Sequence, residues 1–166
     1  MSLESIAISD LMSRNVLVAE QDLNIYGICR ILSNNSIGCV VVVDDLETRK
    51  PVGIITESDI IKVIGKLDQH QLQVPIKNFM STPVFTLSSK ASTADAMKLM
   101  CDKKIRRVVI LENDNLVGIV TDKDLLRCLM QNREMMSSIA SSDSSLPPKQ
   151  SNDDFSHFWF CNSFIH

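Results

Sequence analysis

The sequence predicts an α+β fold in which two β-α-β-β-α units stack on each other and a polar tail follows them. The first reason is a duplicated motif: residues 53–59 (GIITESD) recur as residues 118–124 (GIVTDKD). The second reason is a shared layout, since Met12 and Met80 each close a short amphipathic opening in front of their copy. Each copy then alternates apolar runs typical of strands with stripes typical of helices, which predicts a mixed architecture.

The spacing between the two copies changes at one place. The offset that relates Met12 to Met80 also relates Val40 to Val108, whereas the offset from Gly53 to Gly118 is shorter by three positions. The first copy therefore holds three extra residues within 44–51, where polar residues and a proline favour a longer hairpin loop. Because the length changes only inside a loop, the duplication is structural.

The first copy supplies its elements in order. Residues 16–18 suit a short strand, and an apolar stripe at i, i+3, i+4 and i+7 from Ile25 to Leu32 predicts an amphipathic helix. The other elements expected are a buried strand over 37–43, its hairpin partner over 52–55 and a second helix over 59–67.

The second copy repeats this order. Its expected elements are a strand over 84–87, a helix begun by Ser92 with Asp95 three residues later, strands over 107–111 and 116–120, and a helix over 125–130. A unit of about 60 residues leaves one sheet face uncovered, so two copies stack to bury it. The predicted boundaries are 8–67 for the first repeat, 68–75 for a linker, 76–132 for the second repeat and 135–166 for a low-complexity tail. We expect that tail to be disordered to about residue 154.

The composition excludes several classes of protein. With 166 residues, 45% of them hydrophobic, the chain can bury one good core or two small ones that share a face. A formal charge of −3 predicts no bulk binding to nucleic acid. The early acids Glu4 and Asp10 argue against a signal peptide, and the longest apolar run, 37–43, is too short to span a bilayer. We therefore expect a soluble, cytoplasmic protein without a membrane partner.

The cysteines predict neither disulfides nor a metal site. They are odd in number, they contain no C-x-x-C pair, and three of them fall in helical apolar patterns. No histidine has ligand spacing to a cysteine. We expect reduced core thiols. The residues concerned are Cys29, Cys39, Cys101, Cys128 and Cys161, with His70, His157 and His166.

Each copy of the duplicated motif places a threonine three residues before an aspartate, Thr56 with Asp59 and Thr121 with Asp124. This is the spacing of a capping box, in which both side chains satisfy amides at a helix N-terminus. The same group could hold a phosphorylated sugar, because a hydroxyl, a carboxylate and free backbone N–H groups converge at the positive end of a helix dipole. The two interpretations do not exclude each other, and the duplication favours the second.

These residues resemble the cystathionine-β-synthase (CBS) domain family over residues 8 to about 132. Three patterns carry the resemblance, in which h is a hydrophobic residue and x is any residue. They are the h-x-x-h-Met openings, the Gly-h-h-Thr-x-x-Asp endings and the Ile-Arg-Arg-Val-Val-Ile strand at residues 105–110. It implies two repeats packed with pseudo-two-fold symmetry into one CBS-pair (Bateman) module. It also implies two clefts that bind AMP, ADP, ATP or S-adenosylmethionine as regulatory ligands, no further cofactor, and a homodimer built from the helices that start at Asp59 and Asp124.

The resemblance assigns site residues position by position. Asp59 and Asp124 would each accept from ribose hydroxyls, because the two oxygens of a carboxylate suit a vicinal diol. Thr56 and Thr121 would face the ribose or the first phosphate, and each cleft would be completed by the other repeat. The Asp59 cleft would use Thr82, Val84, Thr86, Ile105, Arg106 and Arg107, and the Asp124 cleft would use Arg14, Val16, Val18, Ile37, Gly38 and Cys39. The strand valines among them could equally be core residues.

The two clefts differ in charge. Arg106 and Arg107 of one cleft are matched by Gly38 and Cys39 of the other, so phosphates should favour the Asp59 cleft. The Asp124 cleft would take a less charged adenosyl ligand or rely on Arg14. Two alternatives stay open: strand alternation would send the two arginines to opposite faces, and residues 103–107 could form a solvated basic patch.

The sequence thus favours a non-catalytic regulatory module, in which an adenosine ligand clamps the repeats and changes the surface offered to a regulated protein. The alternative is a ligand-free dimerisation scaffold of the same fold. An enzyme is not expected, because no histidine stands near an acid or a nucleophile and there is no phosphate loop. The aromatic residues 155–160 are either a docking motif or sequence without a selected function.

Overall fold

A computed structural model of the protein describes residues 6–65 and 73–131. Each half of the chain forms a three-stranded sheet with two helices, which confirms the α+β prediction. The first half contains η2 (Ile8–Asp10), β1 (Val18–Glu20), α1 (Ile25–Asn35), β2 (Cys39–Val43), β3 (Pro51–Thr56) and α2 (Glu57–Ile64). The second half contains η4 (Ile76–Asn78), β4 (Thr86–Ser88), α3 (Thr93–Lys103), β5 (Arg107–Glu112), β6 (Asn115–Thr121) and α4 (Asp122–Gln131). The predicted tail and most of the predicted linker lie outside the described residues.

The two sheets have the same topology and register. In the first sheet β1 runs parallel to β2, and β2 runs antiparallel to β3. The second sheet repeats this with β4, β5 and β6. Val41 pairs with Val18, and its counterpart Val109 pairs with Thr86. The duplication in the sequence is therefore a duplication of the whole layer.

Several elements begin at other residues than predicted. The first strand of each half starts two residues late, at Val18 and Thr86, and β2 starts at Cys39 rather than at residue 37. The apolar residues before these strands pack between elements without joining a ladder, so their hydropathy resembles that of a strand. Helix α2 begins two residues early, because Thr56 is its N-cap, and it ends at Ile64.

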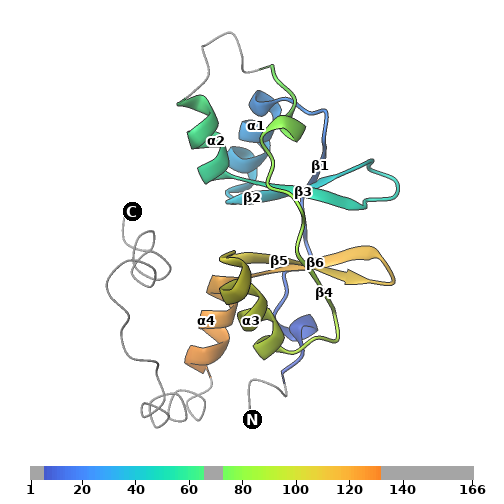
Figure 1. Cartoon of the computed structure of the whole chain (residues 1–166), viewed down its shortest axis with the longest axis vertical. Coiled ribbons are helices and arrows are strands. Elements are labelled where there is room, and N and C mark those ends of the chain that lie inside the picture. The colour runs from blue at the N-terminus through green and yellow to red at the C-terminus, as the bar shows by residue number, and fades with distance from the viewer. Residues whose placement is uncertain (1–5, 66–72, 132–166) are drawn as a thin grey trace.

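The two sheets face each other at the centre of the molecule, and the helices cover their outer faces (Figure 1). Along β2, Val40 and Val42 pack in the core under the helices, whereas Val41 packs between the sheets with Val109 and Ile119. Both faces of β2 are therefore buried, which explains its uninterrupted apolar run. The predicted stacking of the two copies is confirmed.

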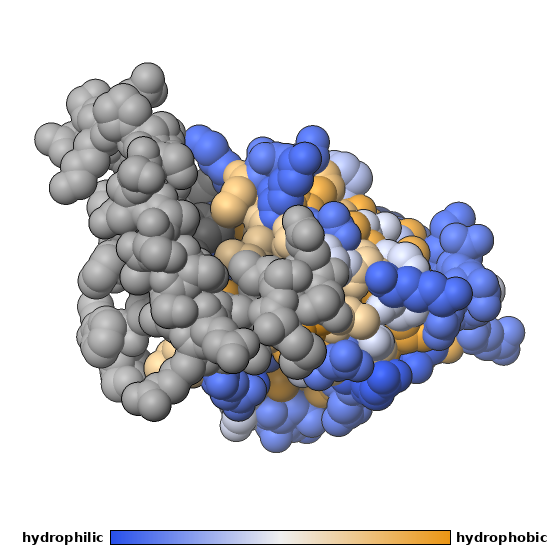
Figure 2. Space-filling model, turned by 90° about the horizontal axis from the view of Figure 1, so that it is seen from below, coloured by the Kyte–Doolittle hydropathy of each residue, from blue (hydrophilic) through white to orange (hydrophobic). Residues whose placement is uncertain are grey.

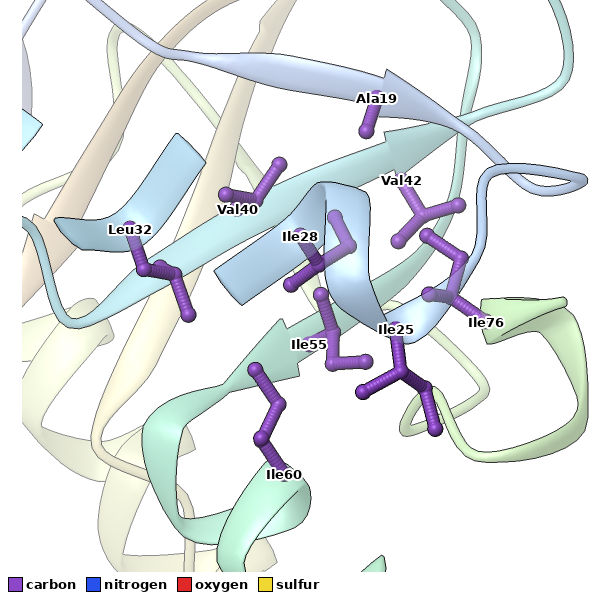
Figure 3. Close-up of a cluster of buried hydrophobic side chains, with 9 residues drawn as sticks. All are labelled: Ala19, Ile25, Ile28, Leu32, Val40, Val42, Ile55, Ile60 and Ile76. Carbon is purple, nitrogen blue, oxygen red and sulfur yellow. The ribbon is translucent and has the colours of Figure 1, made fainter. Parts of the chain in front are cut away.

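Each opening helix packs into the other half. Ile8 and Met12 belong to the core of the second half, and Ile76 lies among side chains of α1 and β2 in the first half (Figure 3). Figure 1 shows this exchange as the blue η2 in the lower half and the bright green η4 in the upper half. Backbone bonds hold both segments, for example from Ile8 N to Ala91 O (2.9 Å) and from Ile76 N to Leu23 O (2.8 Å). The two halves are interlocked.

The cysteines are not all core residues. Cys128 is buried and Cys29 and Cys39 are half-buried, but Cys101 is exposed, so the prediction of a core thiol is wrong there. The preceding residue, Met100, takes the buried position of α3. In the described part of the chain no three acidic, histidine or cysteine side chains cluster as metal ligands. No helix in that part is both long and apolar enough to cross a membrane.

Candidate functional site

Thr56 and Asp59 form the first of two equivalent groups at helix N-termini. The Thr56 hydroxyl accepts from the backbone N–H of Asp59 at 3.2 Å. One carboxylate oxygen of Asp59, Oδ2, accepts from the backbone N–H of Thr56 (3.0 Å) and from its hydroxyl (2.7 Å). The predicted capping box is confirmed. Within the described part of the chain, no donor bonds to the other oxygen, Oδ1.

Most backbone amides at this helix start are already used. Besides the amides of the capping box, the N–H of Glu57 donates to the carbonyl of Gly38 at 3.3 Å. The same bond recurs at α4, where the N–H of Asp122 donates to the carbonyl of Arg106 at 3.0 Å. The prediction of a cradle of free N–H groups is therefore wrong at these positions, because caps and the neighbouring strand end take the donors. Recognition of a phosphate here would depend on side chains.

The equivalent group at Asp124 is more fully engaged. Its Oδ2 accepts from the backbone N–H (2.9 Å) and the hydroxyl (2.7 Å) of Thr121, as at Asp59. Its Oδ1, however, accepts from Nη1 of Arg127 at 3.4 Å. Arg127 is largely exposed and this bond is long, so the pair is weak. Asp59 nevertheless keeps one unbonded oxygen, and Asp124 does not.

A cavity of about 320 Å³ opens beside Asp59, and both halves of the chain wall it. The first half contributes the end of β3 and the start of α2, and the second half contributes the segments that precede β4 and β5. This volume is at the lower end of the range for small-molecule sites, about 300–1,000 Å³. The lining residues are Ile54, Thr56, Ser58, Asp59, Lys62, Ser81, Thr82, Pro83, Val84, Phe85, Lys104, Ile105, Arg106 and Arg107.

The cavity brings together all but one of the residues predicted for the Asp59 cleft. Thr86 is the exception, because it lies within β4, beyond the strand end that faces the cavity. Sequence reasoning missed Lys62, which stands three residues after Asp59, and this helical spacing was the signal that could have found it. The other lining residues that were not predicted are Ile54, Ser58, Ser81, Pro83, Phe85 and Lys104. That these residues bind a ligand stays a prediction.

The cavity is basic. Its lining contains one carboxylate, that of Asp59, and the basic side chains of Lys62, Lys104, Arg106 and Arg107. Both arginines line it, although strand alternation predicted opposite faces, because Arg106 precedes β5 and is not part of the ladder. Four cations around one acid favour an anionic ligand.

Asp124 is not among the residues that line the cavity at Asp59, and residues predicted for its own cleft have packing partners elsewhere. Three of them, Val16, Val18 and Cys39, pack against the apolar cluster between the sheets. This matches the alternative in which the strand valines are core residues. Ile37 packs against the core of the first half. These four side chains are half-buried, as is Val84, which packs in the same cluster and also lines the cavity at Asp59.

Arg14 and the backbone of Val16 also have other partners. Arg14 donates to the carbonyl of Ser9 at 3.3 Å and lines a separate cavity of about 390 Å³ that does not include Asp124. The carbonyl of Val16 accepts from Nη2 of Arg49 at 3.2 Å. Arg49 lies in the longer hairpin loop of the first half, so the extra residues of that copy reach toward this cleft.

Two charged side chains lie close to Gly38. A Cβ placed on Gly38 would be 3.3 Å from Oε2 of Glu57 and 3.4 Å from Nη2 of Arg107. Burial raises the pKa of the neighbouring Cys39 thiol, and the Arg107 guanidinium opposes that rise. Arg107 therefore reaches from the second half into the region that the resemblance assigns to the Asp124 cleft.

The CBS domain family model matches the chain twice, over residues 8–66 and 76–131. An uncharacterized protein of Methanopyrus kandleri is 32% identical over 126 residues, which cover 75% of this chain and 63% of the relative. An uncharacterized protein of Methanocaldococcus jannaschii is 32% identical over 132 residues, which cover 72% of this chain and 31% of the relative. The chain thus spans less than two thirds of the length of these curated relatives.

Solved structures of similar fold include complexes with adenosine compounds. The CBS domain pair of protein MJ0100, in complex with 5′-methylthioadenosine and S-adenosyl-L-methionine, is 27% identical with a TM-score of 0.67 and covers 76% of this chain and 97% of that one. The CBS domain protein PAE2072 from Pyrobaculum aerophilum, complexed with AMP, is 26% identical with a TM-score of 0.66. That match covers 82% of this chain and 99% of the relative.

Proposed function

The chain belongs to the CBS domain family, and we propose that it is a non-catalytic regulatory module that binds an adenosine-containing ligand beside Asp59. The observation that carries this proposal lies at Asp59: its Oδ1 accepts no hydrogen bond from the described part of the chain, and the residue lines a cavity walled by both halves. The complexes of two structural relatives with adenosine compounds support the choice of ligand class.

Each part of an adenosine ligand has suitable partners in this cavity. Oδ1 of Asp59 is the acceptor for a ribose hydroxyl, and an ionised acceptor strengthens that bond. Apolar side chains such as Ile54, Val84 and Ile105 offer surface for the base. The basic side chains of the cavity offer donors to one or more phosphates.

Regulation follows from the position of the ligand between the two halves. A ligand that contacts both walls stabilises only those states in which the walls are correctly spaced. We propose that this difference changes the surface presented to a regulated protein. The Asp124 cleft is a second, weaker site in this proposal, because the oxygen that would take the ribose is bonded to Arg127.

Calorimetric titration of the full chain with AMP, ATP, adenosine and S-adenosylmethionine tests the proposal. Asp59→Ala should weaken binding at least about tenfold, because a hydrogen bond to a charged group is worth about 1.5–3 kcal/mol. Asp95→Ala is the matched control: Asp95 forms the same capping box with Ser92 at the start of α3, and it does not line the cavity. Equal losses in both variants, or none in Asp59→Ala, would contradict the proposal.

We also propose a homodimer built from α2 and α4. Ile61 and Leu126, at equivalent positions of these helices, are both exposed, and so are Ile64 and Met130. Figure 2, which looks onto the end that carries α3 and α4, shows hydrophobic surface among hydrophilic side chains. Light scattering should give a dimer mass for the parent and a monomer mass for the double variant Ile61→Lys with Leu126→Lys. A parent monomer would contradict this.

The alternative function is a ligand-free scaffold of the same fold, which the exposed apolar positions on α2 and α4 favour. A dimer whose melting temperature does not respond to millimolar adenosine compounds would support the scaffold, since any ligand of the folded state raises that temperature. In either case we propose a cytoplasmic protein without a catalytic, nucleic-acid-binding or membrane role, on the strength of its composition.

A further inference from the structure

Arg107 and Cys39 occupy the same position in the two halves. The offset that relates Met12 to Met80 also relates Cys39 to Arg107. Each of the two begins the central strand of its sheet, and each pairs in register with the threonine of its own capping box. Residues at equivalent positions approach each other only where the two halves meet. The Arg107 guanidinium does meet the first half there, beside Gly38 and Cys39.

This guanidinium lies between the cavity at Asp59 and residues that the resemblance assigns to the Asp124 cleft. Arg107 lines the cavity at Asp59, and its Nη2 lies 3.4 Å from the position of a Cβ on Gly38. Gly38 and Cys39 are two of the residues assigned to the Asp124 cleft. The first half offers no cation at these positions, and the Glu57 carboxylate also lies close to Gly38.

We propose that Arg107 is one cation shared by the two clefts, so that an anionic adenosine ligand in one cleft weakens the binding of a second anionic ligand in the other. A single guanidinium turns toward one phosphate at a time, so the second phosphate binds without it. A neutral adenosine ligand has no phosphate for Arg107 to bind, so adenosine in one cleft should not change the affinity of the other cleft for adenosine. The coupling is reciprocal, because it is a free energy between two sites.

The inference rests on the proposed function, since it concerns the same clefts, but it concerns how they communicate rather than whether they bind. Under this proposal, one cation where the two halves meet serves the phosphates of both clefts. With Cys39 in place of a second arginine, the pair of positions at the junction carries one positive charge, partly balanced by Glu57.

Calorimetric titrations of the full chain with AMP and with adenosine test the coupling. The comparison is AMP binding to the Asp124 cleft with the Asp59 cleft filled and with it weakened. In Asp59→Ala, AMP should bind the Asp124 cleft at least about tenfold more tightly than in the second step of the parent, a typical size for coupling between sites. Adenosine should bind that cleft equally tightly in both. In Arg107→Ala the first AMP step should weaken, and adding Asp59→Ala should no longer tighten AMP binding to the Asp124 cleft. Arg107→Gln, which keeps most of the side-chain stem, repeats this test with the least change in packing.

Arg106→Ala is the matched control. Arg106 lines the same cavity, but it is not the residue found beside Gly38, so its loss should weaken the first AMP step and keep the tighter binding that Asp59→Ala gives at the Asp124 cleft. No tightening for AMP in Asp59→Ala, or the same tightening when Arg107 is absent, would overturn the proposal. If AMP and adenosine both fail to bind, the proposed function falls as well.

Discussion

Met12 lies against the backbone of Gly118, and this contact joins the opening of the first copy to the ending of the second. A Cβ placed on Gly118 would be 2.5 Å from Sδ and 2.9 Å from Cγ of Met12. Met80 lies against Gly53 in the same way. The glycine that begins each Gly-h-h-Thr-x-x-Asp ending is therefore needed for close approach by a methionine of the other copy. Neither glycine has a positive φ, so conformational freedom is not the reason.

Gly118→Ala should lower the free energy of unfolding by about 1–3 kcal/mol, the usual effect of overpacking a core. The Met12 side chain can move its sulfur, but its Cβ, 3.1 Å from the added methyl, belongs to a segment held by backbone bonds. Urea denaturation measures the change. Gly65→Ala is the control, because an added Cβ there meets only ordinary contacts, the nearest at 3.5 Å.

A double-mutant cycle with Met12→Ala identifies the contact as the cause. Once the methionine is shortened, the added methyl on Gly118 has room, so the two losses should not add. Strict additivity would mean that the cost of Gly118→Ala arises elsewhere.

Much of the fold could be predicted because it repeats. The copies of Gly-h-h-Thr-x-x-Asp indicated two equal layers, and the uninterrupted apolar run over 37–43 indicated a buried strand, which the structure shows as β2. The exchange of the openings could not be predicted. The spacing of Ile8 and Met12 indicates an apolar face, but the same face fits either half, and spacing does not name the partner.

The sequence predicted half of the residues that line the cavity at Asp59, but not all of the bonds that side chains make at the two clefts. The resemblance, carried over position by position, predicted Asp59 and both arginines in one cleft, and all three line the same cavity. The sequence also predicted that the two clefts differ in charge, but it did not predict the bond from Arg127 to Asp124 or how far Arg107 reaches. Both depend on side-chain rotamers chosen in the folded state, which sequence spacing does not determine.

Glu57→Gln should strengthen AMP binding a few-fold. The Glu57 carboxylate and the Arg107 guanidinium both lie close to Gly38, so the carboxylate should compete with a phosphate for that cation. Calorimetry at low and high salt measures the effect, which should shrink as salt screens the charges. Adenosine is the control ligand: its affinity should not change, and a similar gain for adenosine would contradict the electrostatic explanation.

Asp95 should stabilise the protein at neutral pH and lose this effect at acidic pH. Hydrogen bonds, first from the Ser92 backbone N–H and then from its hydroxyl, lower the pKa of Asp95 below 3.8. A carboxyl group with a lowered folded-state pKa stabilises the fold above pH 3.8, and this contribution is lost as the pH falls through the folded-state pKa. Asp95→Asn should therefore melt at a lower temperature than the parent at pH 7, and the difference should narrow below about pH 4. A difference that stays constant from pH 7 to pH 3 would contradict this.

Ile8→Ala and Ile76→Ala should each damage the half to which they do not belong in sequence. Both side chains are fully buried, so each change should lower the free energy of unfolding by about 2–5 kcal/mol. Amide hydrogen exchange by mass spectrometry locates the loss. Ile8→Ala removes a core contact of α3, β5 and α4 and should speed exchange there first, whereas Ile76→Ala should speed it first in α1, β2 and β3. Leu46→Ala, at an exposed position, is the control and should change neither half. Faster exchange confined to α1 and β2 in Ile8→Ala would mean that the openings are not exchanged in solution.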